Sequence, residues 1–317
     1  MKNQTAAAKI AFQRNPVISF SPILFNIPGR GAELQIKVSA PATGNELPVI
    51  LFSHGGGTSD FLSSMRGYGP VADYFASQGF VVIQPTHENS KALALDPTGP
   101  EGPMFWKSRA IDMRFILDHL SEIEAAVPTL KGRMNKTKIA AVGHSLGGHT
   151  VAMLAGMRMK DVEGQEVSFD EPVIQAFVII SAPGDGADLG DWASAHFAAL
   201  KGSDFSRMKR EALVVAGDKD YHAVFSAREN WRSDAYYRSP GAKCLLTVFG
   251  GEHGLGGIMG YDSDEKSDNP EMLLFVLDNI LAYLQTKLFS NTLYWENKMQ
   301  ALHKEAQPLG KIECKEA

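Results

Sequence analysis

The sequence predicts an α/β protein built on an open, mostly parallel sheet with helices on both faces. Short runs of apolar and β-branched residues alternate along the chain with longer segments of helical periodicity. Several short runs, such as residues 48–53, are apolar at almost every position, which is typical of strands buried on both faces. The chain of 317 residues is long enough to form one such domain around a large core.

The first third of the chain supplies the opening strands of this sheet. Residues 17–25 and 33–38 flank a Pro-Gly-Arg-Gly turn and are predicted as strands. The apolar run at 48–53 is the first buried strand. Residues 68–78 have helical spacing and are followed by a glycine, which suits a helix C-terminus. The next buried strand is expected at residues 80–84.

The middle of the chain continues the alternation after a long loop. Residues 85–104 are rich in proline and glycine and are predicted as that loop. An amphipathic helix is expected over residues 105–123, followed by a strand at 137–142. Small and apolar residues predict a helix at 145–157, and a further strand is expected at 173–180.

The last third is predicted to complete a single domain covering residues 1–289. Residues 183–210 are less regular and suggest a small inserted cap. Strands at 211–216 and 243–249 and a closing helix at 269–288 follow. Residues 290–317 are polar and are expected to form a loosely packed tail.

Composition excludes several classes of protein. The chain has 31 Lys and Arg against 36 Asp and Glu, so it lacks the basic footprint of a nucleic-acid binder. No apolar run reaches the length of a membrane-spanning helix, and no secretory signal is visible. We therefore expect a soluble protein, cytoplasmic rather than secreted, although a signal removed from a precursor stays an alternative. Cys244 and Cys314 form no disulfide framework, and Cys244 is expected to be a small buried hydrophobe in a reducing compartment.

A Gly-x-Ser-x-Gly motif indicates the chemistry. Ser145 stands in Gly143-His144-Ser145-Leu146-Gly147, between a predicted strand and a predicted helix. A nucleophile at such a sharp turn needs flanking glycines, and the helix that follows directs N–H groups towards it. Ser145 is therefore the expected nucleophile, whereas His144 is expected to pack away from the substrate.

A second glycine-rich segment follows the first buried strand. Residues 53–57 read Ser-His-Gly-Gly-Gly, and glycines allow backbone N–H groups to approach a developing negative charge. We expect the oxyanion donors to be the N–H groups of Gly56 and Leu146, with Gly57 the next candidate. His54 is expected to orient this loop rather than act as a base.

The expected acid and base follow two later strands. Asp218 and Asp220 lie in the turn after residues 211–216, and Asp220 is favoured as the acid. His253 follows the strand at 243–249 within a glycine-rich loop. The order Ser145, Asp220, His253 is the Ser, acid, His order of α/β-hydrolases.

These motifs resemble the α/β-hydrolase superfamily over residues 17–288. Within it, the Ser-His-Gly-Gly-Gly loop, the Trp-Lys-Ser-Arg-Ala-Ile-Asp helix start, Gly-His-Ser-Leu-Gly-Gly and Gly-Glu-His-Gly-Leu-Gly-Gly are similar to the dienelactone hydrolase, platelet-activating-factor acetylhydrolase and chlorophyllase-like group. The resemblance implies a triad of Ser145, Asp220 and His253, with Gly56 and Leu146 as the oxyanion hole. Dienelactone hydrolases usually carry a cysteine nucleophile, so Ser145 departs from that pattern.

The expected activity is hydrolysis of carboxylic esters through an acyl-enzyme, with no metal or organic cofactor. The substrate is expected to be a small-molecule, lipid-like or polymeric ester. Gly57, His87, Trp106 and Trp192 are candidate substrate contacts. Amide, carbon–carbon or lactone hydrolysis, peracid formation and a catalytically silent binding role remain alternatives, and the oligomeric state stays open.

Overall fold

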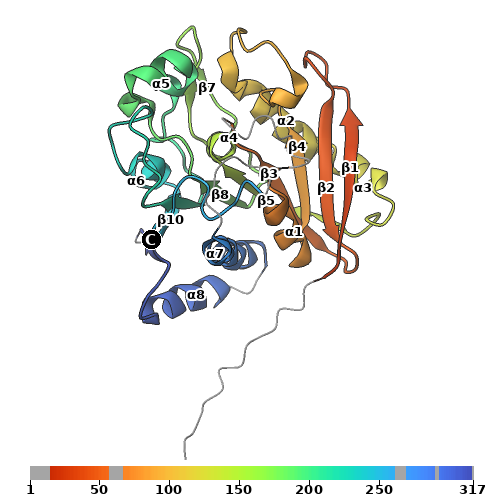
Figure 1. Ribbon diagram of the computed structural model, residues 1–317. Helices are drawn as coiled ribbons and strands as arrows, with labels where there is room; N and C mark the ends of the chain where they lie inside the picture. The colour runs from red at the N-terminus through yellow and green to blue at the C-terminus, as the bar shows by residue number, and fades with distance from the viewer. Residues whose placement is uncertain (1–14, 57–66, 261–268, 290–292, 316–317) are drawn as a thin grey trace, which may run out of the picture.

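The structure is a computed structural model, and it describes residues 15–56, 67–260, 269–289 and 293–315. These residues contain a nine-stranded sheet in the order β1-β2-β4-β3-β5-β8-β9-β10-β11 (Figure 1). Neighbours from β4 to β10 run parallel, whereas β1, β2 and β11 join the sheet antiparallel. The predicted fold class is confirmed. The strands of the sheet are β1 (Val17–Phe25), β2 (Leu34–Pro41), β3 (Leu47–Ser53), β4 (Val81–Thr86), β5 (Met134–His144), β8 (Ala176–Ile180), β9 (Ala212–Gly217), β10 (Ala242–Val248) and β11 (Gly310–Cys314).

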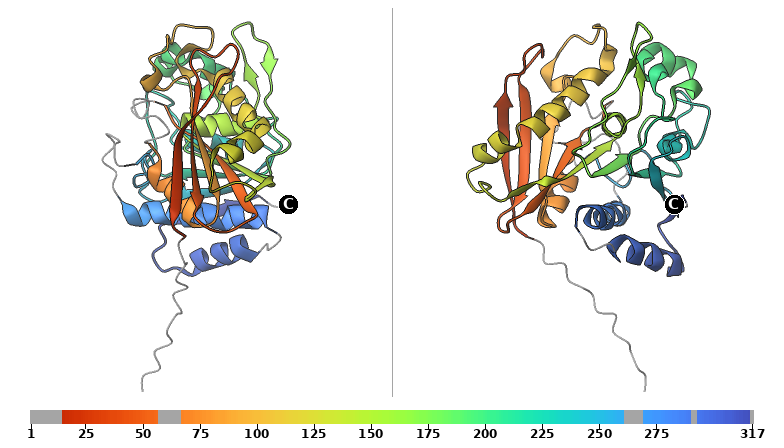
Figure 2. Two further views of the ribbon diagram at one scale, coloured as in Figure 1. Left: turned by 90° about the vertical axis from the view of Figure 1, so that its right-hand side faces the viewer. Right: turned by 180° about the vertical axis from the view of Figure 1, so that it is seen from behind.

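Two helical layers cover the sheet, one on each face (Figure 2). Val49 and Leu51 of β3 pack into one core cluster, and Ile50 and Phe52 pack into the other. This alternation explains why the strand is apolar throughout. No helix in the described ranges is long and apolar enough to cross a membrane. One layer contains α2 (Trp106–Asp118), α3 (Leu120–Ala126) and α4 (Leu146–Leu154), and the other contains α1 (Gly69–Ser77), α7 (Pro270–Leu288) and α8 (Leu293–Lys304).

Several boundaries differ from those predicted. The helix expected over residues 105–123 is two helices, because α2 ends at Asp118 and α3 begins at Leu120. The intervening His119 donates from Nδ1 to the carbonyl oxygen of Phe115 at 2.8 Å. The segment 183–210 contains three short helices, η4 (Gly186–Asp188), α5 (Asp191–His196) and η5 (Ala198–Gly202).

The segment after α7 is not the loosely packed tail that the sequence suggested. In α8, Trp295 and Leu302 are buried in the same core cluster as α7. The Trp295 ring lies 5.5 Å from the ring of Tyr283 in an edge-on arrangement. Strand β11 then pairs with the edge of β10. Trp295, Leu302 and Ile312 of this polar segment are thus placed to pack on the existing core, whereas Leu293 and Tyr294 stay exposed.

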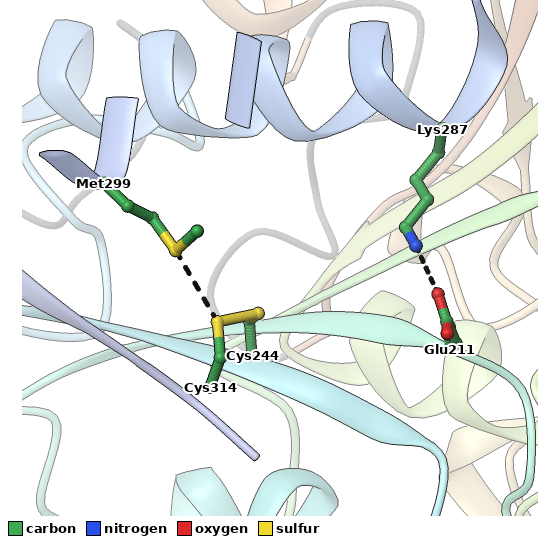
Figure 3. The surroundings of a disulfide bond; sticks show 5 residues. All are labelled: Glu211, Cys244, Lys287, Met299 and Cys314. Carbon is green, nitrogen blue, oxygen red and sulfur yellow. Dashed lines mark hydrogen bonds and ion pairs between the residues drawn. A yellow bond between two sulfur atoms is a disulfide. The ribbon is translucent and has the colours of Figure 1, made fainter. Parts of the chain in front are cut away.

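Cys244 and Cys314 form a disulfide bond, contrary to the expectation that the two cysteines stay unpaired (Figure 3). The two residues are direct partners in the antiparallel pairing of β10 and β11, and their Cα atoms lie 4.1 Å apart. Cys244 is buried, as expected. The sulfur of Met299 from α8 lies 3.8 Å from Cys314 Sγ. A disulfide does not fit the reducing compartment that the sequence suggested.

Candidate active site

Ser145 lies on a sharp turn between β5 and α4. Its backbone has φ 55° and ψ −120°, a conformation that residues with a β-carbon rarely adopt. The flanking glycines make the turn possible, because a Cβ on Gly147 would lie 1.9 Å from the Ser53 carbonyl oxygen. A Cβ on Gly143 would lie 2.2 Å from the carbonyl oxygen of Gly147. The motif therefore presents Ser145 at the carboxyl end of the parallel strands.

A chain of hydrogen bonds joins Ser145 to the predicted base and acid. His253 Nε2 lies 3.0 Å from Ser145 Oγ, and His253 Nδ1 lies 3.0 Å from each carboxylate oxygen of Asp220. A carboxylate only accepts, so Nδ1 carries the proton and Nε2 is left to accept from the hydroxyl. These side chains come from the loops after β5, β9 and β10.

Asp218, the alternative acid, is directed elsewhere. Its Oδ1 accepts a hydrogen bond of 2.8 Å from the backbone N–H of Gly250. It therefore ties the turn after β9 to the loop that carries His253. Asp220 is the carboxylate next to the imidazole, as the sequence analysis favoured.

A buried arginine sets the charge around Asp220. The carboxylate is only 5% exposed, and burial alone would raise its pKa. The Arg232 guanidinium, whose Nε lies 3.4 Å from Asp220 Oδ1, and His253 together hold that pKa below its ordinary value. Arg232 also lies over the rings of Phe225 and Trp231, at 5.4 and 5.3 Å. The carboxylate therefore stays ionised although it is almost fully buried.

The predicted oxyanion loop is fixed by His54. Its Nε2 accepts from the backbone N–H of His87 at 3.0 Å, so its Nδ1 carries the proton and donates to the carbonyl of Gly55 at 2.7 Å. The Gly55 carbonyl and the Gly56 N–H belong to one planar trans peptide and point in opposite directions. His54 thus fixes the orientation of the N–H predicted to bind an oxyanion. Gly57 lies outside the described residues.

His87 does not line the cavity at Ser145, although it was predicted as a substrate contact. It is completely buried, accepts from Ser53 Oγ at 2.9 Å and donates from Nδ1 to Asp112 at 2.8 Å. Asp112 also pairs with Arg30 at 2.9 Å. Burial and the nearby guanidinium groups lower the pKa of His87 well below its ordinary value, so the ring is neutral. His87, which follows β4, therefore supports the oxyanion loop through its hydrogen bonds to Ser53 and His54.

Arg109 is the centre of this support and was not predicted. Its fully buried guanidinium donates to the carbonyl of His54, to Ser53 Oγ at 3.1 Å and to Thr150 Oγ1 at 2.9 Å. Arg109 and Asp112 stand three positions apart on α2, a spacing that by itself suggests only a local ion pair. The contacts of Arg109 join residues 20 to 56 positions apart in the sequence, so local spacing does not reveal them.

A cavity of about 740 Å³ opens above Ser145. Gly56 and Leu146, the two predicted oxyanion residues, both line it together with His253. Within the described ranges, no cluster of His, Cys, Asp or Glu is suited to hold a metal ion. The apolar part of the wall consists of Met104, Leu146, Pro183, Phe197, Leu200, Phe225 and Met259, and the charged part contains Lys219, Glu252 and Arg232.

Neither tryptophan predicted to contact substrate lines this cavity. Trp106 is buried and lines a second cavity of about 590 Å³, which shares Met104 and Phe197 with the first. Trp192 is 46% exposed, and its ring packs against those of His196, Phe197 and Phe225. Trp192 thus supports the wall of the cavity from outside.

This fold and this Ser-His-Asp geometry define a class of hydrolases. The model of the alpha/beta hydrolase family matches residues 50–277, so the chain belongs to that family. Among known proteins, the platelet-activating factor acetylhydrolase of Cavia porcellus is 27% identical over 144 aligned residues. The match covers 34% of this chain and 32% of that relative, so the chain spans about a third of the relative's length. The predicted resemblance to the superfamily and to this acetylhydrolase is confirmed.

Proposed function

We propose that the protein hydrolyses carboxylic esters with Ser145 as nucleophile, His253 as base and Asp220 as acid. The observation that carries this proposal is the continuous hydrogen-bonded chain from Ser145 Oγ through His253 to Asp220 at the wall of a cavity. The match to an acetylhydrolase supports an ester as the substrate class.

In the first half of the reaction, Ser145 Oγ attacks the ester carbonyl while its proton moves to His253 Nε2. The ionised Asp220 stabilises the resulting imidazolium. The N–H groups of Gly56 and Leu146 bind the oxyanion of the tetrahedral intermediate, and the helix dipole of α4 favours the same charge. The imidazolium then protonates the leaving alcohol, and the acyl group remains on Ser145.

In the second half, His253 removes a proton from a water molecule, which attacks the acyl-enzyme. Collapse of the second tetrahedral intermediate releases the carboxylic acid and returns the proton to Ser145. Each step uses only groups of this chain, water and the ester.

The cavity favours an ester with one apolar group of small to medium size. Most of the wall is apolar, and segment 183–210 contributes to it through Phe197 and Leu200. We propose that this segment is the cap of the site. Lys219, Glu252 and Arg232 place charge at the other part of the wall, where a polar leaving group can remain solvated. A lipid acetyl ester, a lactone and a polyester chain all fit this division.

Hydrolysis of p-nitrophenyl esters from acetate to decanoate tests the proposal. The wild type is expected to turn over these esters, and Ser145→Ala is expected to lose at least about 10³ in kcat. Ser206→Ala, at an exposed serine, is the matched control and should retain full activity. Equal rates for the wild type and Ser145→Ala would contradict the proposal.

A further inference from the structure

A buried histidine next to the nucleophile connects the His253 loop to the oxyanion loop. His144 ends β5 and has no exposed surface. Its Nε2 lies 2.8 Å from the carbonyl oxygen of His253, and its Nδ1 lies 3.0 Å from the hydroxyl of Tyr68. The same hydroxyl lies 2.9 Å from the backbone nitrogen of Gly55.

The series of hydrogen bonds runs from the His253 carbonyl, which only accepts, to the Gly55 N–H, which only donates. These two groups fix the direction of every bond between them. The His253 carbonyl only accepts, so Nε2 of His144 carries a proton and donates. Burial lowers the pKa of His144 to about 3, so the ring is neutral and its Nδ1 accepts the hydroxyl proton of Tyr68. The Tyr68 oxygen then accepts from the N–H of Gly55. The chain therefore pairs a donor with an acceptor at each of its three contacts.

Packing holds both side chains in place. The Tyr68 ring lies 5.0 Å from that of Phe52, and the His144 ring lies 4.8 Å from that of His253. The backbone N–H of Tyr68 also donates to the carbonyl of Met259 at 2.9 Å. Neither Tyr68 nor His144 lines the cavity, so neither is placed to touch a substrate.

We propose that Tyr68 and His144 are positioning residues that hold the backbones of His253 and Gly55 in fixed positions relative to Ser145. Gly55 is then fixed on both sides, by Tyr68 at its N–H and by His54 at its carbonyl. The N–H that follows Gly55 along the backbone is that of Gly56. The hydrogen bonds through Tyr68 and His144, here called the relay, therefore align the base His253 and the oxyanion donor Gly56 together. This inference rests on the proposed esterase function and adds two residues to its machinery.

Tyr68→Phe is the sharpest test, because it removes one oxygen atom and keeps the ring against Phe52. We expect kcat on the best p-nitrophenyl ester to fall about tenfold, less than the 10²–10³ for losing an oxyanion donor outright. KM should change by less than about twofold, since no substrate contact is lost. Tyr74→Phe is the matched control, because it removes a hydroxyl from α1 that bonds to Asp278 of α7. Its kcat should equal that of the wild type.

A double variant separates a relay from two unrelated structural effects. If Tyr68 and His144 act through one series of hydrogen bonds, kcat of Tyr68→Phe/His144→Ala should equal the lower of the two single-variant kcat values. Independent effects would instead multiply. Each assay is run below the melting midpoint of the variant concerned, so that only folded protein is compared.

The rate of Ser145 labelling by a fluorophosphonate distinguishes failure of this inference from failure of the proposed function. The labelling rate should fall in Tyr68→Phe in parallel with kcat, and it requires no knowledge of the natural ester. If the wild type hydrolyses esters and Tyr68→Phe matches Tyr74→Phe in kcat and in labelling, the relay is overturned and the esterase function stands. If the wild type shows neither hydrolysis nor labelling at Ser145, both proposals fail.

Discussion

Ser145 is the proposed nucleophile, and its backbone has a conformation that suits glycine. Such a conformation typically costs about 1–3 kcal/mol for a residue with a β-carbon. The glycines at 143 and 147 allow the close approach but do not relieve the strain at Ser145 itself. Stability and catalysis are therefore opposed at this residue.

Replacing Ser145 with glycine is expected to stabilise the fold while abolishing hydrolysis. Ser145→Gly relieves the strain, whereas Ser145→Ala keeps the β-carbon and therefore keeps it. We expect the free energy of unfolding of Ser145→Gly to exceed that of Ser145→Ala by about 1 kcal/mol. Urea denaturation of the two inactive variants measures this difference. A glycine variant no more stable than the alanine variant would contradict the assignment of strain to this turn.

Arg232 is expected to control the acid limb of the pH–rate profile. Burial favours the protonated form of Asp220, and the Arg232 cation opposes this effect and lowers the carboxyl pKa. In Arg232→Gln the opposing charge is gone, so protonation of Asp220 becomes easier. The acid limb of kcat/KM should therefore move to higher pH.

The control for this shift is Arg207→Gln. Arg207 is exposed and pairs only weakly with Glu166, at 3.5 Å. Its profile should overlay that of the wild type from pH 4 to 9. An acid limb in Arg232→Gln that stays in place, or moves to lower pH, is inconsistent with the charge argument.

At the scale of elements, local sequence predicts the buried apolar strands of the sheet. It misses the polar strands and the side chains that are joined to the sheet by contacts with distant parts of the sequence. Strands such as β3 were evident because each is apolar on both faces. Strand β11 was missed because Lys311 and Glu313 give it a polar composition, and only Ile312 packs into the core. The proposed triad residues each follow a strand, and Ser145 and His253 stand among glycines, so local sequence could indicate them as candidates. Arg109 bonds to residues 20 to 56 positions away, and Tyr68 bonds to Gly55 and His144, which are 13 and 76 positions away, so local spacing reveals neither role.

The segment between α5 and η5 is expected to set acyl-chain preference through Phe197. This ring lines both the active-site cavity and the adjoining cavity. Phe197 thus forms a partition between the two cavities. Phe197→Ala removes most of this partition, so longer acyl chains gain buried apolar contact, at about 0.8 kcal/mol per buried CH₂. The ratio of kcat/KM for decanoate over acetate should rise by at least about tenfold.

Leu274→Ala provides the comparison for this element. Leu274 lies on α7 with 42% of its surface exposed and lines neither cavity. Its chain-length profile should be that of the wild type. If Phe197→Ala leaves the profile unchanged as well, the partition between the cavities does not govern selectivity.

At the scale of the whole molecule, the Cys244–Cys314 bond closes a loop of 70 residues that contains the His253 segment and α7. Closing a loop of that length is expected to stabilise the fold by about 2–4 kcal/mol. Reductant should therefore lower the free energy of unfolding of the wild type by that amount. It should have no effect on Cys314→Ser, which lacks the bond already. Equal stability of the wild type with and without reductant, measured by urea unfolding, would show that the bond does not contribute.

The two outer strands also determine how the molecule meets other copies of itself. β1 and β11 both join antiparallel to a sheet whose central strands are parallel, and each forms one edge of the sheet. Without β11, the backbone N–H and C=O groups of β10 would face outward beside Leu245, Leu246 and Val248. An apolar strand with an open edge is a template for pairing with a second chain. The covering strand thus protects against aggregation, a role separate from catalysis and invisible in any assay of the active site.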